Sequence, residues 1–463
     1  MNFWNEKRVK LANPQAKLYN FYDGWNSKGI KITLKDFEDG NIAVIRQNDE
    51  RIGMPKDALE KVFDRASAII VSDAEPFLEL NIPVIEVPDL NKSIIYFAKF
   101  IRRVFKGKAA AITGSSGKST VTKMLYDCLE PYGCASNLNQ ANTTWGICWN
   151  MSNFSLHVPY WVIETSLGGG MTRNSLITRP DYAIVTNVAP VHLKSNQSVE
   201  DIARNKAKIF DAMKDGSVAV IWREMQYFDI LKNAAQDRNL KIITVGESDD
   251  ADIKIETGES NIIHISDKNF EMPVYLPRHF VLDMAFALAV VKETGLSVDD
   301  AAEKLKEFQA LSGRGELYKG KILPDREIIL VDEAFNANPL SMNAALEGFG
   351  KMFKGDDKSR VLILGDMAEG GPETQKNHLA LAQTIEKISP SRILLCGSEM
   401  KILYEALKDK YLCKWYQEFS QLNKDLLNWL KDGDCVFVKS SHSICLYRVV
   451  NYLKILMAKY NNT

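Results

Sequence analysis

The feature that most constrains this chain is a short segment in which an apolar run enters a glycine turn followed by a lysine and two hydroxyls. It reads Ala109-Ala-Ala-Ile-Thr-Gly114-Ser-Ser-Gly117-Lys118-Ser119-Thr120, and residues 121–129 continue with the apolar period of a helix. A strict Walker motif would carry a glycine at Ile112, so this is the shorter Gly-x-x-Gly-Lys-Ser form. The order of strand, turn, Lys-Ser and helix favours a phosphate cradle over a glycine turn before an ordinary helix.

Such a turn has the chemistry to bind a nucleotide. Its backbone N–H groups and the helix N-terminus attract anions, the lysine adds a mobile positive charge, and the serine hydroxyl can ligate Mg²⁺. The predicted nucleotide-binding residues of this loop are Gly114, Ser115, Ser116, Gly117, Lys118, Ser119 and Thr120.

Composition agrees with a cytoplasmic nucleotide-binding protein. The 463 residues are long enough for about three domains, and 46% hydrophobic residues can supply a core to each. The net charge of −1 gives no sign of a nucleic-acid or membrane-surface partner. Seven scattered cysteines without Cys-x-x-Cys spacing predict reduced thiols, and no apolar run is long enough to span a membrane.

Two later strands end in residues able to ligate a metal. Tyr160-Trp-Val-Ile-Glu164 ends in a carboxylate, and the strand over 182–187 is followed at once by Ala-Pro-Val-His192. Ligands collect at the C-terminal ends of parallel strands, where the phosphate loop also lies. We therefore predict Ser119, Glu164 and His192 as metal ligands, against the alternatives of a solvated acid and a structural histidine.

Two further segments are ambiguous from their residues alone. The polar stretch from Asn137 to Thr144 either binds a ligand or caps turns. The aromatic-rich residues 1–30 either cover the domain or form a stacking surface for a substrate. An amphipathic helix after Ser198 carries Lys206, and spacing alone gives that lysine no special status.

Four ordered motifs give the chain a family resemblance. Thr113-Gly-Ser-Ser-Gly-Lys-Ser-Thr, Val162-Ile-Glu164-Thr-Ser, Thr186-Asn-Val-Ala-Pro-Val-His192-Leu and Ile202-Ala-Arg-Asn-Lys206-Ala-Lys-Ile-Phe together resemble the central domain of the Mur ligases. These enzymes form amide bonds with ATP during peptidoglycan precursor synthesis. The likeness extends to the C-terminal segments 312–316, 331–342 and 364–369, and it is greatest to the branch that adds D-alanyl-D-alanine to UDP-N-acetylmuramoyl-tripeptide.

The resemblance implies roles for further residues. Lys206 corresponds to the lysine that CO₂ carbamylates in the family, which makes it a ligand of a second Mg²⁺, and it joins Lys118, His192 and Glu164 in the predicted catalytic set. Arg314, Asn336 and Asn338 are expected to contact the base, ribose or phosphates of ATP. The loop over 365–369 and the tail over 439–443 match segments near the incoming amine.

The chain also departs from the family pattern. Phe280 and Asp283 replace the amides of a His-Asn…Asn pattern that helps hold the nucleotide, and Ser440 and His442 replace residues of a Lys-Gly-Ser-Arg tail. Near the N-terminus the family's Asp-Ser-Arg is replaced by residues 33–36, and its Asp-Gly-His by residues 50–53. The N-terminal changes concern the carboxylate acceptor rather than ATP.

We predict an α/β protein of three domains. A small α/β acceptor-binding domain spans 1–108, a central P-loop NTPase-like domain with a mostly parallel sheet spans 109–312, and a Rossmann-like, doubly wound domain spans 313–463. The last has no Gly-x-Gly-x-x-Gly, which argues against a dinucleotide site.

The predicted function is ATP-dependent amide-bond formation through an acyl phosphate, by a cytoplasmic monomer acting on small molecules with Mg²⁺ and a carbamylated Lys206. The acceptor is either a UDP-sugar peptide of peptidoglycan synthesis or another carboxylate, such as a secondary metabolite, to which the ligase was recruited. A non-catalytic nucleotide-binding protein and a P-loop kinase are the other classes considered. Neither explains why metal ligands, Lys206 and the Asn-Ala-Asn-Pro segment occur together.

Overall fold

The N-terminal part of the chain forms a small α/β unit. The computed structural model describes residues 3–137, 141–168, 170–190, 198–274, 276–353, 359–368 and 373–461. The first sheet has five strands in the order β1-β5-β4-β3-β2, parallel except for β1. Its strands are β1 Lys17–Tyr19, β2 Ile30–Lys31, β3 Ile42–Val44, β4 Ala68–Val71 and β5 Val84–Glu86. Its α-helices are α1 Glu6–Ala12 and α2 Leu59–Val62.

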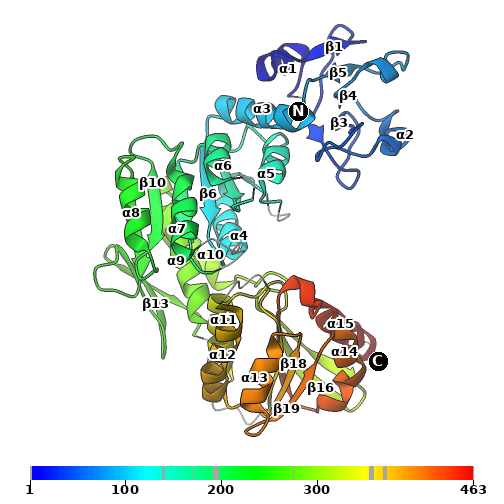
Figure 1. The fold of residues 1–463 in the computed structure, drawn as a ribbon. Coiled ribbons are helices and arrows are strands. Elements are labelled where there is room, and N and C mark those ends of the chain that lie inside the picture. Colours follow the sequence, from blue (N-terminus) through cyan, green and yellow to red (C-terminus); the bar gives the residue numbers. More distant parts are fainter. Residues whose placement is uncertain are drawn as a thin grey trace.

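Helix α3, Leu90–Val104, connects this unit to the next sheet (Figure 1). Asp89 caps the N-terminus of α3 by accepting a hydrogen bond from the Lys92 N–H. The apolar face of α3 packs on two helices of the next sheet, α5 Thr144–Met151 and α6 Met171–Thr178. Trp4, from the aromatic-rich N-terminus, is buried against Phe97 of α3 with ring centroids 5.2 Å apart. Trp4 therefore belongs to the core, which favours the covering role for this part of the N-terminus. The boundary at residue 108 stays a prediction.

The second sheet has nine strands in the order β14-β13-β12-β11-β10-β9-β6-β8-β7. The strands from β7 to β12 pair in parallel and the last two pair antiparallel. The strands are β6 Lys108–Thr113, β7 Cys134–Ser136, β8 Tyr160–Glu164, β9 Tyr182–Val185, β10 Val218–Trp222, β11 Lys241–Gly246, β12 Ile253–Glu256, β13 Asn261–Ile265 and β14 Lys268–Met272. Because the chain crosses from one side of β6 to the other after β8, β6 stands at a topological switch point, where open α/β sheets bind ligands.

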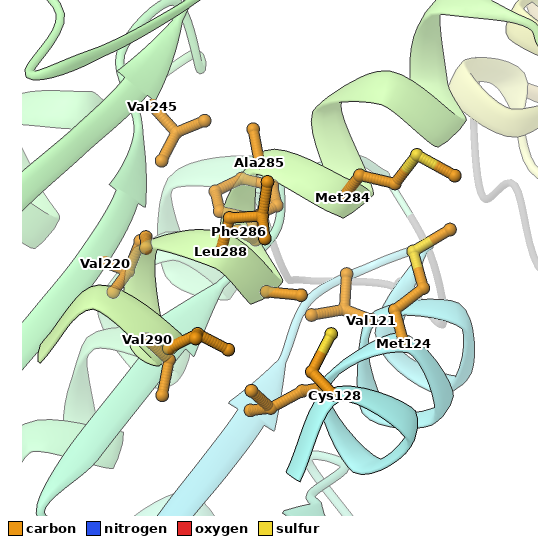
Figure 2. Close-up of a cluster of buried hydrophobic side chains, with 14 of the residues drawn as sticks. Val121, Met124, Cys128, Val220, Val245, Met284, Ala285, Phe286, Leu288 and Val290 are labelled. Carbon is orange, nitrogen blue, oxygen red and sulfur yellow. The ribbon is translucent and has the colours of Figure 1, made fainter. Parts of the chain in front are cut away.

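Helices cover both faces of this sheet (Figure 1). They are α4 Lys118–Leu129, α5 Thr144–Met151, α6 Met171–Thr178, α7 Val199–Ala207, α8 Phe228–Gln236, α9 Arg278–Thr294 and α10 Val298–Lys306. Helix α9 is buried at every position from Phe280 to Val291, as a helix that is apolar on all sides requires. It packs between α4 and strands β10–β13, and Figure 2 shows Phe286 and Leu288 of α9 close to Val121 of α4 and Val220 of β10. This packing fixes the helix that follows the phosphate loop.

The third sheet has six strands in the order β15-β16-β20-β17-β18-β19, parallel except for β15. Its strands are β15 Glu316–Leu323, β16 Arg326–Glu333, β17 Arg360–Gly365, β18 Arg392–Cys396, β19 Leu412–Tyr416 and β20 Cys435–Lys439. Its helices are α11 Pro339–Met352, α12 Thr374–Ile388, α13 Met400–Leu407, α14 Phe419–Trp429 and α15 Tyr447–Asn461. The α/β, three-domain prediction is confirmed, while the exact boundaries stay predictions. Within the described ranges, no helix is long and apolar enough to cross a membrane.

Substituting Phe286 tests whether the α4–α9 core holds the central domain together. Phe286 is 0% exposed, so Phe286→Ala is expected to lower the free energy of unfolding by about 3–5 kcal/mol through lost burial and a residual cavity. The measurement is urea denaturation followed by tryptophan fluorescence. Val274 is 61% exposed, so the control Val274→Ala should change stability by about 0.5 kcal/mol or less. Equal midpoints for the two variants would contradict this account.

Candidate functional site

The phosphate loop lies between β6 and α4 and is shaped by residues from the end of β9. Gly117 adopts a left-handed conformation (φ 77°) where α4 begins. The Asn187 side chain accepts hydrogen bonds from the Ser115 and Ser116 N–H groups at 3.1 and 2.9 Å, and Thr186 Oγ1 donates to the Ser116 carbonyl at 2.6 Å. A side chain at Gly114 would place its Cβ 1.8 Å from Thr186 Oγ1. The sequence analysis quoted Thr186 and Asn187 only as part of a motif and assigned neither this role.

Lys118 and Ser119 begin α4 and point toward the loop and the end of β8. Lys118 Nζ donates to the Gly114 carbonyl at 2.8 Å, and burial lowers its pKa, an effect that the charge of Glu164 opposes. Ser119 Oγ donates to Glu164 Oε2 at 2.7 Å. A hydroxyl and a carboxylate beside a phosphate cradle are the hard oxygen ligands that Mg²⁺ prefers, so this pair fits the predicted metal.

The polar stretch after β7 holds Glu164 in place. Asn142 Nδ2 donates to Glu164 Oε1 at 2.7 Å. Asn137 is buried and exchanges two hydrogen bonds with the Glu164 backbone, at 2.7 and 3.0 Å. Both asparagines therefore position the carboxylate that faces Ser119, which neither of the two interpretations from the sequence foresaw.

Lys206 lies in the last turn of α7, which Ser198 opens with the predicted capping box. It is 2% exposed, and its amino group forms no hydrogen bond or ion pair with any residue the structure describes. Burial, and then the positive charge of Lys118, lower its pKa well below the usual value for lysine. A lowered pKa favours the neutral amine, which is the nucleophilic form of a lysine side chain.

One of the four predicted metal ligands lies outside the described residues: His192 is in 191–197. Glu369 of the amine-side loop, in 369–372, also lies outside them. Among the residues that are described, no group of three or more His, Cys, Asp or Glu side chains converges. The metal prediction therefore rests, in this structure, on Ser119 and Glu164.

A cavity of about 940 Å³ opens in front of the phosphate loop, and the central and C-terminal parts both line it. This volume is in the range of small-molecule sites. The predicted residues on its wall are Ser115, Ser116, Gly117, Lys118, Ser119, Thr120, Glu164, Arg314, Asn336 and Asn338. Gly114 and Lys206 are not lining residues, although the loop and α7 that carry them lie beside the cavity. Helix α9 adds His279, Phe280 and Asp283.

The C-terminal wall of the cavity carries one buried ion pair and one further cation. Lys439 Nζ forms a buried ion pair with Glu333 at 2.8 Å and donates to the Asn336 carbonyl at 3.1 Å. Arg314 lies 4.0 Å above the ring of Phe335, and its buried Nε has no hydrogen-bond partner in the part of the chain that the structure describes. Asn338 caps α11 by accepting a hydrogen bond from the Ser341 N–H. Arg314 is thus a cation that a phosphate or carboxylate would satisfy.

The two segments expected near the amine form one hydrogen-bonded edge. Ser441 Oγ accepts from the Ala368 N–H at 2.7 Å and donates to the Ala337 carbonyl at 3.3 Å. His378 is buried and accepts from the Met367 N–H at 2.9 Å. Asp366 accepts hydrogen bonds from Glu399 and Met400 at the start of α13. These contacts fix the loop after β17 to the loops after β16 and β20, while His442 is exposed and stacks on Tyr447.

Comparison with known proteins gives two family matches. The model described as Mur ligase middle domain matches residues 112–291, and the model described as Mur ligase, glutamate ligase domain matches residues 313–442. Two curated relatives carry the name UDP-N-acetylmuramoyl-tripeptide--D-alanyl-D-alanine ligase. The one from Rickettsia prowazekii is 24% identical over 97% of this chain and 99% of the relative. The one from Bacillus subtilis is 25% identical over 96% and 95%.

Solved structures show the same fold. MurF from Acinetobacter baumannii superposes with a TM-score of 0.82 at 19% identity, covering 98% of this chain and 99% of that structure. MurF ligase from Thermotoga maritima in complex with ADP gives a TM-score of 0.76 at 21% identity, covering 95% of this chain and 100% of that structure.

Gly114→Ala tests the close approach between the phosphate loop and β9. Because the added Cβ meets Thr186 Oγ1 at 1.8 Å, the loop must shift, and we expect ADP affinity to fall at least about tenfold, the cost of one or two lost charge-assisted hydrogen bonds. Isothermal titration calorimetry with ADP measures this, and thermal denaturation checks the fold. Gly216 has open space around its Cβ position and φ 76°, so Gly216→Ala is a control that should leave ADP affinity unchanged.

Asn142→Ala tests whether this asparagine positions Glu164 for a metal. Removing the donor frees Glu164 Oε1, and outer-sphere partners of this kind typically alter metal affinity by about 10- to 100-fold. We expect ADP binding to need about tenfold more Mg²⁺, with little change in metal-free ADP affinity. Asn428→Ala removes a surface amide that donates to Asp425, and it should leave the Mg²⁺ dependence as it is. An unchanged Mg²⁺ requirement in Asn142→Ala would refute the positioning role.

Proposed function

This chain belongs to the Mur ligase family and is a MurF-like ATP-dependent ligase, and we propose that it joins the carboxylate of UDP-N-acetylmuramoyl-tripeptide to the amine of D-alanyl-D-alanine. Relatives with that name match almost the whole chain and are themselves covered almost completely. The observation that carries the proposal is the cavity in which the phosphate loop, Glu164 and Arg314 face one another.

The chemistry requires activation, because a carboxylate is a poor electrophile. A carboxylate oxygen of the acceptor attacks the γ-phosphorus of ATP, and the bond to the β-phosphate oxygen breaks, which gives an acyl phosphate and ADP. The amine of the second substrate then attacks the acyl carbon, phosphate leaves, and the ammonium proton passes to solvent. An amide, ADP and phosphate are the products.

The residues of this chain supply charge and orientation. The family uses ATP and Mg²⁺, and when bound, Mg²⁺ would be held by Ser119 and Glu164 and would neutralise charge on the transferring phosphoryl group. Lys118 and Arg314 contribute fixed positive charge from opposite walls of the cavity. We expect the C-terminal wall to close over the loop and exclude water, which would otherwise hydrolyse the acyl phosphate.

We also propose that Lys206 is carbamylated in the active enzyme. A neutral buried amine adds to CO₂ and releases a proton, and the resulting anion would lie near the cation of Lys118. Before carbamylation, burial and then repulsion by Lys118 lower the pKa of Lys206. The carbamate removes this repulsion because it is negatively charged. The carbamate oxygens would then hold a second Mg²⁺, together with His192 in our prediction. The nucleotide contacts predicted for residues 114–120, Arg314, Asn336 and Asn338 are part of the same proposal.

One observation in the N-terminal unit favours an acceptor other than UDP-N-acetylmuramoyl-tripeptide. Gln47 Oε1 accepts hydrogen bonds from Ser72 and Asp73 N–H groups at 2.9 and 2.8 Å, and Glu50 accepts from the Gln47 N–H at 3.0 Å. The backbone N–H groups of Gln47, Ser72 and Asp73 are thus already hydrogen-bonded to the chain's own side chains. Together with the missing Asp-Ser-Arg, this supports a ligase recruited to a different carboxylate. Either acceptor is a small molecule, and we expect a cytoplasmic monomer.

The deciding experiment mixes purified protein, ATP, Mg²⁺ and bicarbonate with UDP-N-acetylmuramoyl-tripeptide and D-alanyl-D-alanine, and measures ADP release and product mass. We expect amine-dependent ADP release and a product heavier by the dipeptide less water. Release only with other carboxylates or amines from a panel would support the recruited ligase. ADP binding without turnover on any pair would favour the non-catalytic alternative.

Lys206→Ala tests the carbamate separately. Loss of this lysine is expected to reduce kcat by at least about 100-fold, and acetate or formate should restore part of it by replacing the missing carboxylate. Lys208→Ala, which changes an exposed lysine on the same helix turn, is the matched control. In the wild-type protein, ¹³C NMR with ¹³C-bicarbonate should show a carbamate signal that Lys206→Ala lacks. Full activity without Lys206 would refute this role.

A further inference from the structure

Asp283 is a buried acid on the wall of the nucleotide cavity, and none of the described residues pairs with it. It lies in the second turn of α9, is 6% exposed and lines the cavity. Its carboxyl forms no hydrogen bond or ion pair with any residue in the described ranges. Buried polar side chains without a partner are uncommon in folded proteins, and each one calls for an explanation.

The position of the carboxyl makes its ionisation state important. A Cβ built on Gly117 would lie 2.9 Å from Asp283 Oδ1 and 3.4 Å from Oδ2, so the carboxyl packs directly on the phosphate loop. An ionised carboxylate there would repel the phosphates that the loop attracts. A neutral carboxylic acid would not, and it offers one O–H donor and one carbonyl acceptor.

Burial favours the neutral form, and the charge of Arg314 opposes it. Burial raises the pKa of Asp283 well above its usual value, and the guanidinium of Arg314 opposes this shift. The other titratable groups that line the cavity are Lys118 of α4, Glu333 and Lys439 of the C-terminal wall, Glu164 of β8, and Arg278 and His279 of α9 itself. Lys439 is paired with Glu333 and Arg278 with Glu247, and burial lowers the pKa of His279 to about 4. Within the described ranges, no cation forms an ion pair with Asp283.

We propose that Asp283 binds the nucleotide as a neutral carboxylic acid, donating its O–H to an acceptor atom of ADP or ATP. The inference rests on the proposed function, because it takes the cavity to be the nucleotide site. An amide in this place would offer one donor group and one acceptor at all pH values, whereas the acid does so only while it keeps its proton. This chain would thus preserve the hydrogen bonding of an amide with a pH-dependent group.

The test compares ADP binding by the full-length protein and two variants, Asp283→Asn and Asp283→Ala, with isothermal titration calorimetry between pH 6 and pH 9. At pH 6 the wild-type protein and Asp283→Asn should bind ADP within about threefold of each other, because both present a donor. Asp283→Ala should bind about five- to tenfold more weakly, the value of one lost hydrogen bond. Thermal denaturation without nucleotide checks that both variants fold.

The pH profile separates binding from a structural role. The affinity ratio of wild type to Asp283→Asn cancels the titration of ADP and of the shared cavity groups. As the pH rises through the pKa of Asp283 in the free protein, wild-type affinity should fall relative to Asp283→Asn, by up to about tenfold per pH unit. Loss of affinity in Asp283→Ala for inorganic diphosphate as well as ADP would place the acceptor on a phosphate. Loss for ADP alone would place it on the nucleoside, and both results support the inference.

Two results would overturn it. If Asp283→Ala and Asp283→Asn both bind ADP more tightly than the wild type at pH 6, the carboxyl is ionised and repels the nucleotide. If all three proteins bind equally at every pH, Asp283 does not contact it. A wild-type protein that does not bind ADP at all would instead refute the proposed function, and this inference with it, so the two failures are distinguishable.

Discussion

The structure depends on keeping one turn of backbone open. A phosphate cradle needs a turn of backbone that neighbouring residues hold in one conformation, because its polar groups would otherwise pair differently. Here the end of β9 does so, because Asn187 binds the N–H groups of Ser115 and Ser116 and Thr186 binds the Ser116 carbonyl. These contacts are possible because β9 lies directly beside β6 in the sheet. Helix α9 packs against α4, the helix that follows the loop. The core in Figure 2 therefore stabilises the site as well as the fold.

The cavity that results is electrostatically incomplete. Lys206 and Asp283 are buried without partners among the described residues, and the Nε of Arg314 is unpaired. In a protein core such groups would destabilise the folded state, because nothing there replaces the hydrogen bonds that they make to water. Under the proposed function, ligands complete the groups that line the cleft: phosphates pair with the guanidinium of Arg314, and an acceptor atom of the nucleotide pairs with Asp283. Perturbed pKa values clustered in one cleft are typical of functional sites.

The sequence predicted the parts of this site that are local and left out those that are not. Strand, turn and helix around Lys118 follow from residue order. In the C-terminal part, apolar runs over 328–332, 360–365, 392–396 and 434–439 predict strands by the same kind of local pattern, and the structure has β16, β17, β18 and β20 there. Strands β13, β14, β15 and β19 were missed because their polar or alternating residues resemble loops; their burial patterns alternate, as expected for strands with one solvated face.

The contacts between Asn142 and Glu164 and between Asn187 and the loop join residues 22 and about 70 positions apart, so no local pattern reveals them. Asn338 illustrates the converse limit. Its position before Pro339 predicts a helix cap as readily as a nucleotide contact, and the structure shows the cap.

The two ends of the site have diverged from the family pattern by different amounts. At the nucleotide end, the change at Asp283 can be compensated in place, because an acid that keeps its proton substitutes for an amide, and the cradle, Glu164 and Lys206 remain. In the N-terminal unit, where we propose that the acceptor binds, Gln47 and Glu50 accept hydrogen bonds from backbone N–H groups. A ligand that used these donors would have to displace the two side chains, and each displaced hydrogen bond would weaken its binding by about 0.5–1.5 kcal/mol. Under the proposed function, ATP chemistry tolerates little geometric change, whereas acceptor recognition belongs to a separate small domain that can change without it. The reaction and the choice of substrate would then be determined by different parts of the chain.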